Sequence, residues 1–135
     1  MGFLNRVMLI GNLGRDPEIR YTKEGVPVAT FTIATNEYFR DKSGEKVVKT
    51  EWHRVVAWRK LAEWVVQFLS KGKQVYVEGK IRTREYDDKN GIKRRVTEIV
   101  ALRIQLLGVP PSTDTISEET EEPPPEAIES EDVPF

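Results

Sequence analysis

The sequence contains no cysteine and only one histidine, His53. Without thiols the chain forms neither a disulfide framework nor a thiolate metal site, and one imidazole is too few for a structural zinc site. No Ser or Asp is placed by the sequence to form a triad with His53, and no Cys nucleophile exists. We therefore expect no cofactor, no metal and no enzymatic activity, and we interpret His53 as a structural or subunit-contact residue.

Long apolar runs are also absent. None approaches the roughly 20 residues that a membrane-spanning helix needs, and residues 1–6 lack the charged and apolar regions of a secretion signal. The stretch Gly11-Asn12-Leu13-Gly14 is too short for a dinucleotide or Walker loop. These absences predict a soluble protein of the cytoplasm with no membrane partner, and glycines that serve strand ends and turns.

Basic residues are missing from one part of the chain. Residues 109–135 contain no Lys or Arg and nine acidic residues, a net charge of −9. Residues 1–108 hold all 21 basic residues and the other 13 acidic ones, a net charge of +8. The basic body favours polyanionic ligands, and the acidic tail should compete weakly for the same surface.

The boundary near Gly108 also separates a part of the chain that we expect to be ordered from a part that we expect to be disordered. Beyond Gly108 there is no periodic apolar pattern, and charge and proline are abundant. Such a segment buries too little surface to offset the entropy of ordering. We predict one domain over residues 1–108 and a disordered acidic and proline-rich linker over 109–130, which is followed by a short end segment over 131–135.

Within the body, period-two patterns predict strands over residues 5–12, 28–38, 50–58, 74–84 and 96–106. The apolar centre of the first run indicates burial on both faces, and the fifth run carries apolar Val96, Val100, Leu102 and Ile104. Asn90-Gly91 lies between the last two runs, and this pair favours a type I′ hairpin turn.

One helix interrupts the strands. Its apolar stripe is Leu61, Trp64, Val65, Phe68 and Leu69, and Gly72 follows as a stop. The order is therefore three strands, a helix and two strands. This predicts an all-β fold with one helix, an OB-fold in which a five-stranded Greek-key barrel has its helix between strands 3 and 4. Another small barrel would share this order.

Aromatic residues with cations close by are the strongest functional signal. Single-stranded nucleic acid is held by cations on its phosphates and by aromatic faces on which bases stack. Phe39, Trp52, Trp58 and Tyr86 each lie close in sequence to Arg or Lys residues. The alternative is a core position, which we assign to Phe31, Trp64 and Phe68 from their place on apolar faces. For Trp52 and Trp58 the pattern leaves core and surface equally open.

The body resembles the bacterial single-stranded DNA-binding protein family. The matching stretches include Asn5-Arg-Val-Met-Leu-Ile-Gly-Asn-Leu-Gly-Arg-Asp-Pro-Glu18, Ala34-Thr35-Asn36, Thr50-Glu-Trp-His-Arg-Val-Val56, Lys60-Leu-Ala-Glu63, Lys71-Gly-Lys-Gln-Val-Tyr-Val-Glu-Gly79 and Arg82-Thr-Arg84. They extend through essentially all of residues 1–108, which makes the resemblance far more specific than one short motif.

This resemblance implies a function and a set of site residues. It implies a nucleoid-associated homotetramer that binds and protects single-stranded DNA without sequence specificity during replication, recombination and repair. Stacking would fall to Phe39, Trp52, Trp58 and Tyr86, and phosphate contacts to Lys42, Arg54, Lys60, Lys71 and Arg84. The tip that recruits genome-maintenance proteins would be Glu131, Asp132, Val133, Pro134 and Phe135.

Two other functions remain to be distinguished. An OB-type module for RNA binding or for protein assembly, such as a primosome component, would share the barrel, and stacking alone does not separate RNA from DNA. The acidic tail favours DNA binding, because RNA-binding OB domains have no evident need for one. A nuclease is the third possibility, and cleavage of DNA in the presence of Mg²⁺ would reveal it.

Overall fold

The computed structural model describes residues 1–108. Its elements, in chain order, are β1 (Val7–Leu13), β2 (Glu18–Tyr21), β3 (Pro27–Arg40), β4 (Lys46–Trp58), α1 (Lys60–Phe68), β5 (Gln74–Asp87) and β6 (Lys93–Leu107). The predicted linker 109–130 and tip 131–135 lie outside the described residues. Over residues 1–108, no helix has the length and apolar character that a membrane span requires.

Five of the strands close into a barrel. Neighbours follow the order β1-β5-β6-β4-β3, and β1 pairs again with β3 at Asn12–Ala34 and Leu13–Ile33. The pairing of β4 with β6 is parallel, whereas the other pairings are antiparallel. Since α1 connects β4 to β5, the third and fourth barrel strands, the predicted OB-fold is confirmed.

The core lies inside this barrel. Alternate residues of the strands point inward, including Phe31, Ile33 and Val55, and α1 packs Ala62 and Val65 against them. Each large aliphatic side chain that is fully buried contributes about 1.5–3 kcal/mol relative to exposure. The assignment of Phe31 to the core is thereby confirmed.

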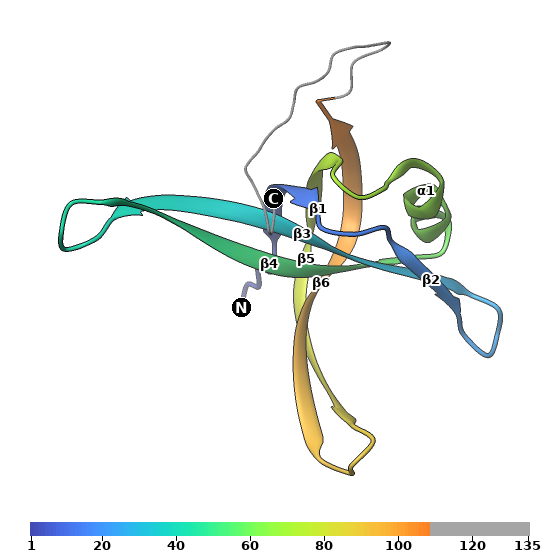
Figure 1. The fold of residues 1–135 in the computed structure, drawn as a ribbon. Helices are drawn as coiled ribbons and strands as arrows, with labels where there is room; N and C mark the ends of the chain where they lie inside the picture. The colour runs from blue at the N-terminus through green and yellow to red at the C-terminus, as the bar shows by residue number, and fades with distance from the viewer. Residues whose placement is uncertain (109–135) are drawn as a thin grey trace.

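Two long hairpins extend beyond the barrel as arms (Figure 1). The β3–β4 arm and the β5–β6 arm project in different directions, and the short β2–β3 hairpin projects from another side. The predicted strands stopped near the barrel because residues in the arms bury little apolar surface. Their pairing instead continues through backbone hydrogen bonds as far as Arg40–Lys46 and Asp87–Lys93.

The three hairpins end in three turns that share one hydrogen-bond pattern. The glycine N–H of each turn donates to the carbonyl three residues earlier, in the pairs Thr22–Gly25, Asp41–Gly44 and Asp88–Gly91. Each of these glycines has positive φ, but Asn90 does not, so the predicted type I′ turn is wrong. Asp88 explains the difference, because its Oδ1 accepts hydrogen bonds from the N–H groups of Asn90 and Ile92 and stabilises another turn.

Strand β2 was not predicted. It has four residues and pairs only with β3, and most of its side chains are exposed. Such a short polar strand has no apolar alternation, because it lies outside the closed barrel and buries little of its own surface.

Two predicted burial patterns are also wrong. Met8 and Ile10 of β1 are exposed, so this strand buries one face rather than two within the described chain. Phe68 is 45% exposed, although Trp64 is half-buried and packs against both the core and the Phe68 ring. Phe68 is the last residue of α1, where the apolar stripe leaves the barrel surface.

A β-bulge changes which residues of β6 face the core. Val100 pairs with Lys80 and Ala101 with Gly79, but Arg103 then pairs with Glu78. The extra residue, Leu102, is exposed and shifts the side-chain alternation by one position. Ile99 and Ala101 therefore face the core on one side of the bulge, and Ile104 and Leu106 pack against it on the other.

Candidate nucleic-acid interface

Three adjacent strands, β4, β6 and β5, present one continuous outer face. Strand register places Arg82 of β5 directly opposite Glu98 of β6, and an ion pair joins Arg54 of β4 to the same carboxylate. We call this surface the outer cationic face. Its residues are Trp52, Arg54 and Trp58 from β4, Arg82, Arg84 and Tyr86 from β5, and Glu98 from β6.

The four predicted stacking rings are exposed. The exposed fractions are 48% for Phe39, 45% for Trp52, 37% for Trp58 and 46% for Tyr86. A core position for Trp52 and Trp58, which the sequence left open, is thereby excluded for the single chain. Each ring offers surface on which a base would stack.

Trp52 is held in place by the backbone near Gly14. A Cβ atom at Gly14 would lie 2.5 Å from Cζ3 of the Trp52 ring, so only a residue without a side chain fits beneath the indole. Gly14 follows β1, and its N–H donates to the carbonyl of Thr32. The end of β1 therefore sets the position of a ring that belongs to β4.

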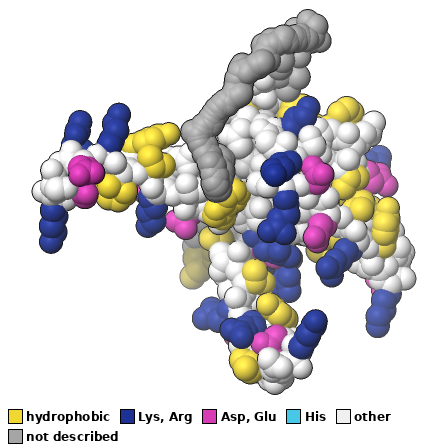
Figure 2. Space-filling view, in the orientation of Figure 1, with side chains coloured by type: hydrophobic (Ala, Val, Ile, Leu, Met, Phe, Trp, Pro, Cys, Tyr) yellow, Lys and Arg dark blue, Asp and Glu magenta, His cyan; other side chains and the backbone are white. Residues whose placement is uncertain are grey.

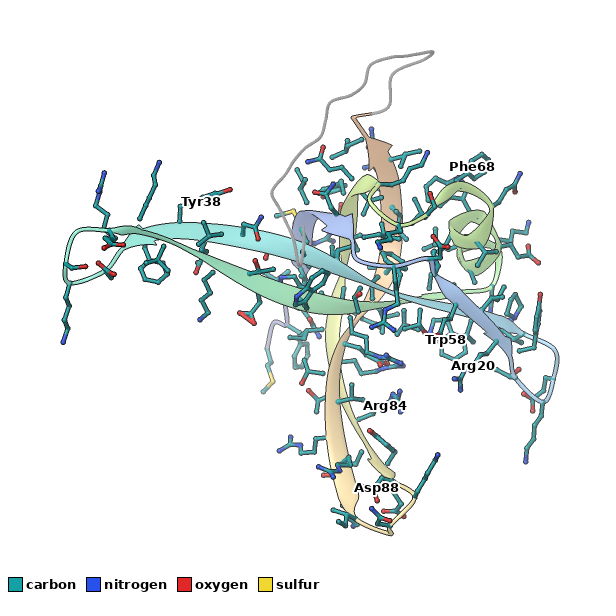
Figure 3. All side chains as sticks on the ribbon, in the orientation of Figure 1. Arg20, Tyr38, Trp58, Phe68, Arg84 and Asp88 are labelled. Carbon is teal, nitrogen blue, oxygen red and sulfur yellow. The ribbon has the colours of Figure 1, made fainter. Side chains whose placement is uncertain are left out.

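Tyr86 lies on the β5–β6 arm, beside Arg84. The guanidinium carbon of Arg84 is 5.7 Å from the centre of the Tyr86 ring, within the range of a cation–π contact. Arg84 itself projects from this arm in Figure 3. Because Arg84 also contacts Glu98, it links the ring on the arm to the cluster at the centre of the face.

Phe39 does not share this face. In the β3–β4 pairing Phe39 is opposite Val47, whereas Ala34 is opposite Trp52, so the alternation of side chains places Phe39 and Trp52 on opposite faces. Tyr38, which is 65% exposed, occupies the face of Trp52 instead and points away from the arm in Figure 3. Sequence reasoning missed Tyr38 because the register between the two strands was unknown.

Two of the predicted phosphate contacts converge on one buried carboxylate. Arg54 Nε lies 3.5 Å from Glu98 Oε1, and Arg84 Nε lies 3.4 Å from Glu98 Oε2. Arg82 donates to the same Oε2. Glu98 is 1% exposed because these guanidinium groups cover it on the outer face.

The charge of Glu98 is maintained despite burial. Burial alone would raise the pKa of the Glu98 carboxyl, but the hydrogen bond from Arg82 and the charge of Arg84 outweigh it and lower the pKa below its usual value. The carboxylate is therefore ionised at neutral pH, and the three arginines with Glu98 carry a net positive charge.

The three predicted lysines are dispersed. Lys42 lies in the turn that ends the β3–β4 arm, and Lys60 is the first residue of α1. Lys71 follows the helix, and its backbone N–H donates to Asp16 Oδ1 at 2.8 Å, while the next N–H, of Gly72, donates to the carbonyl of Leu13. Figure 2 shows Lys and Arg side chains over the centre of the molecule and along both arms.

Arg20 is a further cation that the sequence reasoning missed. It lies opposite Val28, which in turn lies opposite Trp58, so Arg20 and Trp58 belong to one row across three strands. Both side chains are seen below this part of the sheet in Figure 3. No signal in the sequence placed Arg20 there, because β2 itself was not predicted.

His53 has a structural environment. Its side chain is half-buried, and its Nε2 lies 2.8 Å from Oγ1 of Thr35 on the paired strand. Burial lowers the pKa of the imidazole, and the charge of Glu51 opposes this only in part. The ring is therefore neutral near pH 7, which agrees with a structural interpretation.

Known proteins match this chain over most of the described residues. The model of the single-strand binding protein family matches residues 4–107. The "Single-stranded DNA-binding protein 1" of Chlorobaculum tepidum is 56% identical over 106 residues, which cover 78% of this chain and 65% of the relative. The protein of the same name from Xylella fastidiosa is 53% identical over 109 residues, 80% of each chain. The chain thus spans slightly less than two thirds of the first of these relatives.

Solved structures show the same fold. A structure described as the Plasmodium falciparum SSB complex with ssDNA matches with a TM-score of 0.72 and 36% identity, covering 79% of this chain and 97% of the other. A deletion mutant of the single-stranded DNA binding protein from Thermus aquaticus matches with a TM-score of 0.67 and 34% identity, covering 77% of this chain and 50% of the other.

Proposed function

The chain belongs to the single-strand binding protein family, and we propose that it binds single-stranded DNA with little sequence preference and catalyses no reaction. The observation that carries this proposal is the outer cationic face, where exposed Trp52, Trp58 and Tyr86 alternate with arginines. The named relatives support DNA as the polymer. Bound strands would be protected during replication, recombination and repair in the cytoplasm, at the nucleoid.

The two kinds of side chain have different tasks. Each base stacked on a ring should contribute on the order of 1–3 kcal/mol, and any base suffices because all have a π-face. Each phosphate neutralised by a cation should make the logarithm of affinity fall with the logarithm of salt concentration at a slope of about −0.7. Binding should therefore depend on salt and tolerate any sequence.

A fluorescence titration tests the proposal. Adding oligo-dT should quench the emission of exposed Trp52 and Trp58, and the affinity should decrease with salt. A duplex of the same length should bind far more weakly, because its bases are already stacked on one another. Equal affinity for oligo-dT and oligo-U would favour the RNA-binding alternative, and absence of binding to oligo-dT would contradict the proposal.

Self-association forms the second part of the proposal, and we expect a homotetramer. Met8 and Ile10 give the outer face of β1 an exposed apolar surface, which monomers rarely leave open. Light scattering without DNA should report a mass four times that of one chain, and the increase in mass on adding a long oligo-dT should report how much DNA the assembly binds. A monomeric mass for the wild-type chain would contradict this part of the proposal. The Ile10→Glu variant should form a smaller assembly than the wild type.

Recruitment of partner proteins would belong to the tip, Glu131, Asp132, Val133, Pro134 and Phe135. An acidic pair followed by apolar residues is a pattern that a basic-edged apolar pocket recognises in extended peptides. Deleting residues 133–135 should abolish capture of replication, recombination and repair proteins and leave affinity for oligo-dT intact. Replacing residues 133–135 by Ser-Gly-Ser provides a control of equal length. Unchanged capture of partner proteins by either variant would refute the proposed role of the tip.

A further inference from the structure

Glu98 is the one buried carboxylate in the part of the chain that the structure describes. It lies on the middle strand of the outer cationic face, with Arg54 on one neighbouring strand and Arg82 and Arg84 on the other. A negative charge at the centre of a surface that binds a polyanion is unfavourable for that binding by simple Coulomb attraction. Its position therefore calls for a compensating role.

The arginines contact Glu98 through particular nitrogens. Arg54 and Arg84 both use Nε, the nitrogen inside the side chain. Over residues 1–108 no hydrogen bond involves their terminal nitrogens, and the two side chains are 41% and 44% exposed. The terminal pair of N–H groups on one edge of a guanidinium is the part that binds a phosphate bidentately.

Arg82 is attached differently. Its terminal Nη2 donates to Glu98, and its Nε is buried without a hydrogen-bond partner. The three side chains are exposed to a similar degree, so the difference lies in the nitrogen that each uses: a terminal nitrogen in Arg82, and Nε in Arg54 and Arg84.

We propose that Glu98 is a positioning residue that holds Arg54 and Arg84 by their Nε atoms, so that their terminal nitrogens are aimed outward to grip two phosphates of the bound strand. The inference rests on the proposed function and assigns a task within the same face. The gain comes from preorganisation, because a free arginine loses rotamer freedom when it binds a phosphate and an anchored one has already lost it. The Arg84 contact with the Tyr86 ring would then align a gripped phosphate with a stacked base.

The sign of one substitution separates this role from a purely electrostatic one. Glu98→Gln removes a negative charge from the face, so charge alone predicts tighter binding to oligo-dT. Loss of positioning predicts the opposite, a loss of affinity of about tenfold if roughly one charge-assisted hydrogen bond's worth of free energy is forfeited. Binding as tight as that of the wild type, or tighter, would overturn the proposal.

Glu85→Gln is the matched control. Glu85 is on β5, next to Arg84 in sequence, but alternation places it on the opposite face from Arg84, and over residues 1–108 it forms no ion pair. The same change of charge there should leave affinity unchanged or raise it by up to about twofold, as expected for a screened surface charge. A loss equal to that of Glu98→Gln would show that positioning is not the cause.

A second set of variants leaves Glu98 in place, in case Glu98→Gln fails to fold. Arg54→Lys and Arg84→Lys conserve charge but provide no Nε anchor and no two-pronged edge. Each should weaken binding to oligo-dT by about fivefold, within the range for one charged hydrogen bond, and unchanged affinity in both would refute the proposal. In a folded Glu98→Gln background, Arg84→Lys should cost little further affinity.

An NMR measurement without DNA separates failure of this inference from failure of the proposed function. The Nε–H signals of Arg54 and Arg84 in the full chain should be resolved and exchange slowly with water, and should lose that protection in Glu98→Gln. If the wild-type protein does not bind oligo-dT while these signals are protected from exchange, the proposed function is wrong but Glu98 still holds the two arginines. If it binds oligo-dT but the signals exchange freely, the positioning role fails.

Discussion

At the scale of single residues, two tryptophans of similar chemistry have different surroundings. Trp52 lies over Gly14 with much of its ring exposed, whereas Trp64 is half-buried and packs against the core and Phe68. The environment rather than the residue type therefore decides which ring is free to stack on a base. The two positions provide a direct comparison.

Trp52→Ala should weaken binding to oligo-dT by on the order of 1–3 kcal/mol, the contribution of one stacked base. Trp64→Ala should instead lower the free energy of unfolding by about 3 kcal/mol, the lower end of the range for a large core ring, because the partly buried ring leaves a cavity beside the core. Fluorescence titration and urea unfolding of both variants measure the two effects. Unchanged affinity for Trp52→Ala would remove Trp52 from the stacking set.

His53 makes stability depend on pH. Burial lowers the pKa of the folded imidazole below its ordinary value of about 6.5, so the unfolded chain binds the proton more readily. Stability from this group is full above that ordinary value and is lost as the pH falls below it. The melting temperature should fall from about pH 7.5 to about pH 5.5, and His53→Gln, which keeps a polar partner for Thr35, should reduce that fall. An identical pH profile for the variant would contradict this.

At the scale of elements, the β5–β6 arm is held by its turn. Asp88 Oδ1 accepts hydrogen bonds from two backbone N–H groups, and its Oδ2 pairs with Arg94 at 2.9 Å. The hydrogen bond from Arg94, followed by that from the Ile92 N–H, lowers the pKa of Asp88. The carboxylate therefore keeps its charge and these hydrogen bonds at neutral pH. The arm carries Tyr86 and Arg84, and its order should therefore affect DNA binding.

Asp88→Ala should loosen this arm and leave the barrel intact. We expect amide hydrogen exchange to rise in the arm alone, and affinity for oligo-dT to fall by about threefold, less than complete loss of one stacked ring would cost. Asp41→Ala, at the equivalent turn of the β3–β4 arm, serves as the control for Tyr86. If exchange rose throughout the barrel, the arm would not be an independent element.

At the scale of the whole molecule, opposite charges lie in separate parts of the chain. Residues 1–108 carry +8 and residues 109–135 carry −9. An acidic segment joined to a basic surface lowers the local potential that attracts a polyanion. This effect is electrostatic and should vanish as salt screens it.

Truncation after residue 108 should raise affinity for oligo-dT at low salt by about threefold to tenfold, and the gain should disappear near 1 M salt, where the screening length is about 3 Å. A full-length variant with the nine acidic residues of 109–135 changed to Asn or Gln should behave like the truncated one, which separates charge from length. Equal affinities at low salt for all three proteins would show that the tail does not compete.

The residues of the candidate site that share one strand were predictable from their spacing in the sequence. Trp52, Arg54 and Trp58 have even spacing in one strand, which places them on one face whatever the fold. Glu98 and Tyr38 carried no such signal, since their significance arises from pairing with strands far away in sequence. Arg82 and Arg84 were visible as a pair, but not their shared partner.

By itself the sequence determined the order of the five barrel strands and the helix and the separation of charge, because periodicity and composition are local properties. The boundary near Gly108 stays a prediction. Only the tertiary structure decided the strand register, the β-bulge at Leu102, and hence which side chains meet. A shift of one residue moves every side chain to the other face, and that shift depends on pairing between distant strands. The observed register places Phe39 on the opposite face from Trp52, and it brings three arginines around Glu98.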